Sequence, residues 1–183
     1  MKKLLFVITL LLSLTGFSQI FKAKDGTTLI HFYSKSPLED IEASNKGAVI
    51  VLNTTSSEIQ IRVTIQNFKF KNALMEEHFN ENYMESTKYP SCIFRGKINE
   101  KIDFTQDGEN KVTVTGKMEL HGVTKDVTLE GMLTKKGTEI VLDSKFKIKV
   151  ADYNIQVPSL YVKNIADVVD VTVTSTLEPF VKK

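Results

Sequence analysis

The chain has 183 residues, of which 42% are hydrophobic and 25% charged, and these values are typical of a single folded domain rather than a disordered chain. It contains 24 Lys and Arg and 22 Asp and Glu, and because Lys2 and Lys3 belong to a separate leading segment, the rest of the chain carries 22 residues of each sign. This balance excludes the basic excess with which nucleic-acid-binding proteins attract phosphates, so no nucleic-acid partner is expected.

Residues 1–18 have the pattern of a secretory signal peptide. Lys2 and Lys3 supply a positive start, residues 4–14 form an apolar run, and small residues follow at Gly16 and Ser18. A membrane anchor is the rival interpretation, but the run is shorter than the about 20 residues that span a bilayer. We therefore expect cleavage near Ser18, a periplasmic or secreted protein without stable membrane insertion, and one domain over residues 19–183.

Short strands separated by turns are predicted for most of the remaining chain, beginning with residues 28–34 and 48–53. Residues 58–66 alternate strictly, and their apolar face consists of Ile59, Ile61, Val63 and Ile65. Phe68 and Phe70 have the opposite parity, so a bulge or a strand end is expected near Asn67.

One short helix is predicted to interrupt the strands over residues 72–84. Met75, Phe79 and Tyr83 recur every four residues, which is the spacing of one helix face. Asn72 is a suitable N-cap, and the Tyr89-Pro90 pair ends the connection because proline disfavours a helical residue before it.

Strands resume after Pro90 and continue to residue 177 with the same alternation. Turn residues separate them at Asp107-Gly108, where a hairpin turn is predicted, at His121-Gly122 and at Lys136-Gly137. The apolar faces of these strands consist of Cys92, Phe94, Ile98, Val112, Val114, Met118, Leu120, Val127, Leu129, Leu133, Ile140, Leu142, Phe146, Ile148, Val150, Val169, Val171 and Val173. About eight strands with one apolar face predict an all-β antiparallel barrel or sandwich.

Residues suited to catalysis or metal binding do not form a recognisable pattern. The sequence contains none of the common hydrolase, phosphate-loop or zinc motifs, and His31, His78 and His121 are too widely spaced to predict a metal site. Asp152 and Asp167 fit turn and surface positions. The apolar interior remains, and it fits a solid core or a cavity for one small ligand equally well, because both need the same residue types.

Residues 114–132, VTGKMELHGVTKDVTLEGM, resemble the hallmark of the YceI family, in which Gly-Val-Thr-Lys leads into a Val-x-Leu strand. The helix with His78, followed by Tyr89-Pro90 and Phe94, resembles an upstream segment of that family, and residues 152–155 and 165–173 resemble its C-terminal part. The resemblance implies a lipocalin-like antiparallel β-barrel with one short helix at its side or mouth. It also implies an exported bacterial protein that binds a long isoprenoid or related apolar chain, and it implies no catalytic residues.

We therefore expect non-catalytic binding, transport or storage of a polyisoprenoid, quinone or fatty-acyl chain, with no metal and no cofactor beyond such a bound lipid. Two alternatives stay open, namely a barrel enzyme acting on a hydrophobic substrate and a ligand-free structural protein of the cell envelope. The sequence also leaves a homodimer open. The residues expected to contact the ligand are Ile59, Ile61, Val63, Ile65, Phe68, Phe70, Met75, Phe79, Phe94, Val112, Val114, Met118, Leu129, Phe146, Ile148 and Val171.

Overall fold

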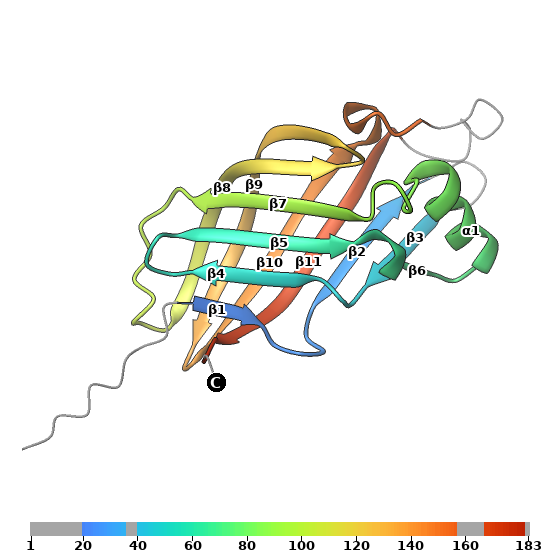
Figure 1. Ribbon diagram of the computed structural model, residues 1–183. Coiled ribbons are helices and arrows are strands. Elements are labelled where there is room, and N and C mark those ends of the chain that lie inside the picture. Colours follow the sequence, from blue (N-terminus) through green and yellow to red (C-terminus); the bar gives the residue numbers. More distant parts are fainter. Residues whose placement is uncertain (1–19, 36–39, 157–166, 182–183) are drawn as a thin grey trace, which may run out of the picture.

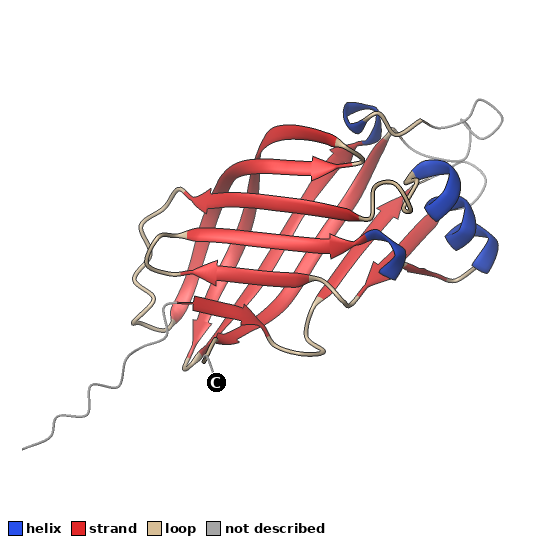
Figure 2. Cartoon of the chain, viewed as in Figure 1, coloured by secondary structure: helices blue, strands red, loops and turns tan. Residues whose placement is uncertain are grey.

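The computed structural model in Figure 1 describes residues 20–35, 40–156 and 167–181. The expected signal peptide and its cleavage site near Ser18 lie outside these residues. Within them, eleven strands form one antiparallel sheet, and short helical elements gather toward one end of it (Figure 2). The strands are β1 (Ile20–Ala23), β2 (Leu29–Ser34), β3 (Ile41–Asn45), β4 (Val49–Asn53), β5 (Glu58–Thr64), β6 (Lys69–Phe70), β7 (Ser91–Ile98), β8 (Gly108–Leu120), β9 (Val123–Lys136), β10 (Glu139–Lys149) and β11 (Val168–Pro179). The helical elements are η1 (Ile65–Asn67), α1 (Ala73–His78), η2 (Phe79–Tyr83) and η3 (Val150–Tyr153).

The sheet closes into a barrel because β1 pairs with β4 on one side and with β11 on the other. From β1 the hydrogen-bonded order runs through β4, β5, β7, β8, β9, β10 and β11 and returns to β1, so the described strands contain a closed ring of eight. The predicted antiparallel barrel of about eight strands is confirmed. Closure leaves the ring without the free edges of an open sheet.

The remaining three strands are β2, β3 and β6, and they lie outside the ring of eight. Along the chain they adjoin β1, β4 and β5, and a kink separates each from its ring strand. β2 follows β1 along β11, β3 lies beside β2, and β6 lies beside β3. The chain between β5 and β6 is the 3-10 turn η1, which confirms the strand end expected near Asn67. These kinks carry β2, β3 and β6 toward the end of the barrel where α1 lies (Figure 1).

The predicted helix is confirmed, although its second half is wider than an α-helix. The side chain of Asn72 caps α1 by accepting a hydrogen bond of 2.9 Å from the backbone N–H of Leu74. η2 continues the helix as a π-turn, in which the N–H of Met84 donates to the carbonyl of Phe79 over 2.9 Å. The ring of Phe79 stacks on Phe32 at 5.5 Å, so this packing holds the helix on β2.

One predicted turn, at His121-Gly122, is confirmed, and another, at Asp107-Gly108, is wrong. His121 and Gly122 join β8 to β9 with φ values of 50° and 73°, which is the backbone that a two-residue hairpin needs. The Asp107-Gly108 prediction is wrong, because residues 99–107 form a longer connection and Gly108 already belongs to β8. The Asp107 carboxylate instead accepts a hydrogen bond from the N–H of Gly137 at 2.9 Å, so it supports the neighbouring β9–β10 turn.

One end of the barrel is solid. Five large side chains from β1, β4, β9, β10 and β11 fill it. Each of these residues has 6% or less of its surface exposed. We call this set the floor, and it consists of Phe21, Leu52, Leu133, Ile140 and Leu177. The register places Leu52 beside Phe21 and Ile140 beside Leu177 on neighbouring strands. Each such side chain contributes about 1.5–3 kcal/mol by leaving water.

Candidate functional site

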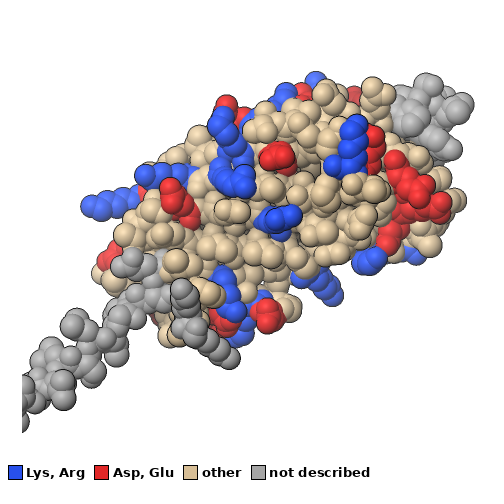
Figure 3. All heavy atoms as spheres, viewed as in Figure 1, with Lys and Arg blue, Asp and Glu red and all other residues tan. Residues whose placement is uncertain are grey.

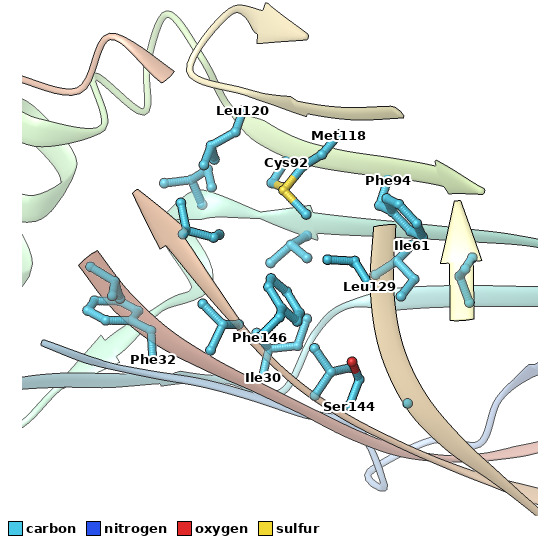
Figure 4. A pocket seen from close by; sticks show the side chains of 18 of the residues that line it. Ile30, Phe32, Ile61, Cys92, Phe94, Met118, Leu120, Leu129, Ser144 and Phe146 are labelled. Atoms are coloured by element: carbon cyan, nitrogen blue, oxygen red, sulfur yellow. The ribbon is translucent and has the colours of Figure 1, made fainter. Parts of the chain in front are cut away.

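Beyond the floor the barrel is hollow and holds an apolar cavity of about 190 Å³. Strands from around the ring turn their inward residues into it, as Figure 4 shows for Ile61, Phe94, Met118, Leu129 and Phe146. The barrel thus contains both a solid core and a cavity. Side chains fill one end of it, and the cavity lies in the other.

The structure brings together fourteen of the sixteen residues expected to contact a ligand. These fourteen line the cavity, and they are Ile59, Ile61, Val63, Ile65, Phe68, Phe79, Phe94, Val112, Val114, Met118, Leu129, Phe146, Ile148 and Val171. Their position in the lining follows from strand parity. Their contact with a ligand stays a prediction.

Phe70 and Met75 are not among the cavity-lining residues. Phe70 packs behind the lining, with its ring 5.0 Å from that of Phe79. Met75 is half-buried on α1, one turn before the residues that reach the cavity. Met84, which follows the π-turn, lines the cavity together with Phe79.

Other lining residues were not predicted. Ile30 and Phe32 share one face of β2, and Leu142 shares the parity of Phe146 on β10, so alternation alone could have identified all three. Met84 and Ile155 also line the cavity, but they lie outside the strands. No periodic signal marks such positions.

Few polar groups reach the cavity. Besides Cys92 and the backbone of Gly131, the lining includes only Glu130 and Ser144 as polar residues among those described. Glu130 is exposed on the outside of β9. The Ser144 hydroxyl donates to the backbone carbonyl of Glu130 over 2.6 Å, which satisfies its hydrogen. The lining therefore offers hydrocarbon contact and few directional bonds.

Cys92 points its sulfur into the cavity (Figure 4). This side chain is partly buried, and its exposed part faces the cavity. Burial raises the pKa of this thiol to about 12, and the nearby Glu119 carboxylate raises it further by a smaller amount. The thiol is consequently protonated at neutral pH and is a poor nucleophile.

This protonation makes a labelling prediction. At pH 8 a thiol with that pKa is ionised to roughly one part in 10⁴, against roughly a quarter for an unperturbed cysteine. We expect a thiol-reactive dye to label Cys92 on the order of 10³-fold more slowly in the folded protein than in urea. Labelling followed by absorbance measures both rates, and equally fast reaction of the folded protein would contradict the buried placement.

A hydrogen-bonded cluster ties three segments together at the end of the cavity away from the floor. His121 is buried, with Nδ1 3.1 Å from the carbonyl oxygen of Tyr153 and Nε2 3.0 Å from Oε2 of Glu85. The ring of Tyr89 lies 4.4 Å from the His121 ring, and a Cβ on Gly122 would come within 2.6 Å of Tyr89. The β8–β9 turn therefore requires glycine and joins η3 to the segment after η2.

Among the described residues, neither the charged side chains nor the potential metal ligands form a second candidate site. Acidic side chains gather around α1 and η2, and elsewhere on the visible face both signs are interspersed (Figure 3). Within residues 20–35, 40–156 and 167–181, no three His, Cys, Asp or Glu side chains are placed to hold a metal ion. In the same residues, no helix has the length and apolar character needed to cross a membrane.

Known proteins resemble this chain in sequence and in fold. The family model of the YceI-like domain matches residues 23–177. Protein YceI of Shigella flexneri is 27% identical over 111 residues, which cover 57% of this chain and 55% of that protein. The chain thus spans about half the length of this relative.

Two solved structures share the fold over most of their length. A polyisoprenoid-binding domain from Saccharophagus degradans has a TM-score of 0.74 and 16% identity, covering 89% of this chain and 99% of that one. BcnA of Burkholderia cenocepacia has a TM-score of 0.71 and 18% identity, covering 85% and 98%. At these identities the likeness establishes the barrel fold alone.

Proposed function

The chain belongs to the YceI-like domain family, and from that premise we propose that it binds one long apolar chain inside its barrel and carries or stores it without catalysing a reaction. The observation that carries the proposal is the cavity, whose lining is hydrocarbon apart from Cys92, Glu130 and Ser144. The description of the Saccharophagus degradans neighbour as polyisoprenoid-binding supports the same ligand class.

The energetics favour a chain without specific polar contacts. Each buried methylene contributes about 0.8 kcal/mol, so ten of them contribute about 8 kcal/mol before the cost of ordering the ligand. The cavity volume of about 190 Å³ is below the roughly 300–1,000 Å³ of sites for drug-sized molecules. We therefore propose a narrow, flexible occupant, such as an isoprenoid, a quinone tail or a fatty-acyl chain, rather than a fused ring system.

The proposal also includes an exported location and the absence of catalysis. The signal-peptide pattern of residues 1–18 supports a periplasmic or secreted carrier. A catalytic alternative would need a polar group poised inside the cavity. Cys92 is held protonated and the Ser144 hydroxyl is engaged with the backbone, which supports binding rather than catalysis.

A displacement titration tests this proposal. Purified protein, extracted with solvent and refolded, is titrated with the fluorescent fatty acid cis-parinaric acid. We expect saturable binding near one per chain, and displacement by a C16 fatty acid but not by its C6 homologue. Because the two competitors share a carboxylate, equal displacement would mean that the head group rather than the chain is recognised, and the proposal would fail.

A further inference from the structure

The barrel wall is incomplete between β9 and β10. The two strands pair from Glu139 with Lys136 as far as Ser144 with Gly131, and their ladder ends there. β9 extends back to Val123, where it remains paired with β8, and β10 extends to Lys149, where it remains paired with β11. Two facing strand segments, residues 123–130 and 145–149, are therefore unpaired with each other among the described residues.

The two strands approach closely just before they part. A Cβ on Gly131 would lie 2.9 Å from the backbone oxygen of Asp143, so this pair needs glycine. From there the β8–β9 hairpin bends over the barrel and away from β10 (Figure 1). The strands thus part directly beyond this closely packed pair.

The far end of this gap is closed by side chains. His121 Nδ1 lies 3.1 Å from the carbonyl of Tyr153, and Lys125 Nζ lies 3.7 Å from Oδ1 of Asp152. These contacts join the β8–β9 turn and the beginning of β9 to η3, which follows β10. The gap is consequently a bounded break in the hydrogen-bonded wall, which we call the side window, between Gly131–Ser144 and Lys125–Asp152.

The edges of the side window belong to the cavity. Leu129 on β9, with Phe146 and Ile148 on β10, line the cavity and are only partly buried. An outer groove across β8–β11 meets the cavity at Glu130, Gly131 and Ser144, which line both. Leu129, Phe146 and Ile148 thus give the side window an apolar inner edge, and the groove outside it is lined mainly by polar side chains.

We infer that the side window is the route by which the apolar chain enters and leaves the barrel. This inference rests on the proposed function and adds the path to it. The floor fills one end of the barrel, and the His121 cluster ties down the segments at the other. A chain passing sideways between Leu129 and Phe146 contacts apolar side chains of the cavity lining and breaks no ladder hydrogen bond, because none joins the strands there.

A cleavable cross-link across the side window tests the route. Thr128 and Lys147 are exposed positions on its two edges, and both are changed to Cys in a Cys92→Ala background. A short bis-maleimide with a central disulfide joins them. Uptake of cis-parinaric acid by the ligand-free protein is then followed by stopped-flow fluorescence, before and after the disulfide is reduced.

We expect the cross-link to slow uptake by about tenfold or more, which corresponds to an added barrier of about 1.4 kcal/mol, and reduction to restore the rate in the same protein. The matched control carries Cys at Thr134 and Val141, which are partners within the intact β9–β10 ladder, and its cross-link should leave the rate unchanged. Unchanged uptake by the cross-linked window variant, with saturable binding retained, would overturn the inference and leave the proposed function standing. Absence of saturable binding in the unmodified protein would overturn both.

Discussion

Replacing Leu177 with Ala is expected to lower the free energy of unfolding by about 3–4 kcal/mol. Leu177 is fully buried in the floor, on β11 between Ile140 of β10 and Ala23 of β1. Truncation there removes transfer free energy and leaves a void that the neighbouring strands cannot fill without breaking their ladders. Urea denaturation followed by circular dichroism measures the change.

Leu129→Ala is the matched comparison, because it removes the same atoms from the cavity wall. Leu129 is only partly buried and already borders empty space, so the loss is expected to be about 1 kcal/mol. Equal destabilisation by the two changes would show that floor and cavity wall are packed alike, contrary to the division of the barrel into a solid and a hollow end.

The second large effect is on ligand affinity. Ile61→Asn places an amide in the cavity wall on β5, opposite Phe94 of β7. A bound hydrocarbon would have to strip water from that amide without replacing its hydrogen bonds, which costs about 2–3 kcal/mol. The affinity for cis-parinaric acid should therefore fall roughly 30- to 150-fold. Fluorescence titration measures it.

Arg62→Asn provides the control for this change. Arg62 follows Ile61 on the same strand and is exposed on the outer face. It should leave the affinity within about twofold, since surface substitutions of this kind change free energies by about 0.5 kcal/mol or less. Undiminished affinity in Ile61→Asn, in a protein that unfolds at the wild-type urea concentration, would place the ligand outside the cavity.

The alternation of apolar residues was sufficient to predict an antiparallel barrel or sandwich and most of the cavity lining, and the resemblance to the YceI family indicated the barrel. Strand parity is a local property with a period of two residues, so Ile59, Ile61 and Val63 can be assigned to the inner face without knowledge of their partners. The kinks that turn β1 into β2 and β4 into β3 depend on pairing with distant strands. Such pairing has no local signal, so β1 and β3 did not emerge from the sequence, whereas β2 was predicted as residues 28–34 and the strand end before β6 was predicted near Asn67.

The division of the interior could not be predicted for a related reason. Leu177 of the floor and Val173 of the cavity wall lie on the same face of β11 and have the same chemical character. What differs is their neighbours on the paired strands, because Leu177 lies between Ala23 and Ile140 and Val173 lies between Ser144 and Ile30. Met84 and Ile155 show a second limit, since π-turns and irregular segments bring residues into the lining without any periodic spacing.

The most direct test of an apolar chain in the barrel is to identify what the protein carries when it is purified without detergent. Native mass spectrometry gives the mass of the complex, and solvent extraction followed by mass spectrometry gives the structure of the released molecule. We expect one elongated lipid per chain, present in wild-type protein and depleted in Ile61→Asn. A wild-type protein that is consistently empty, and that takes up no apolar chain afterwards, would contradict the account.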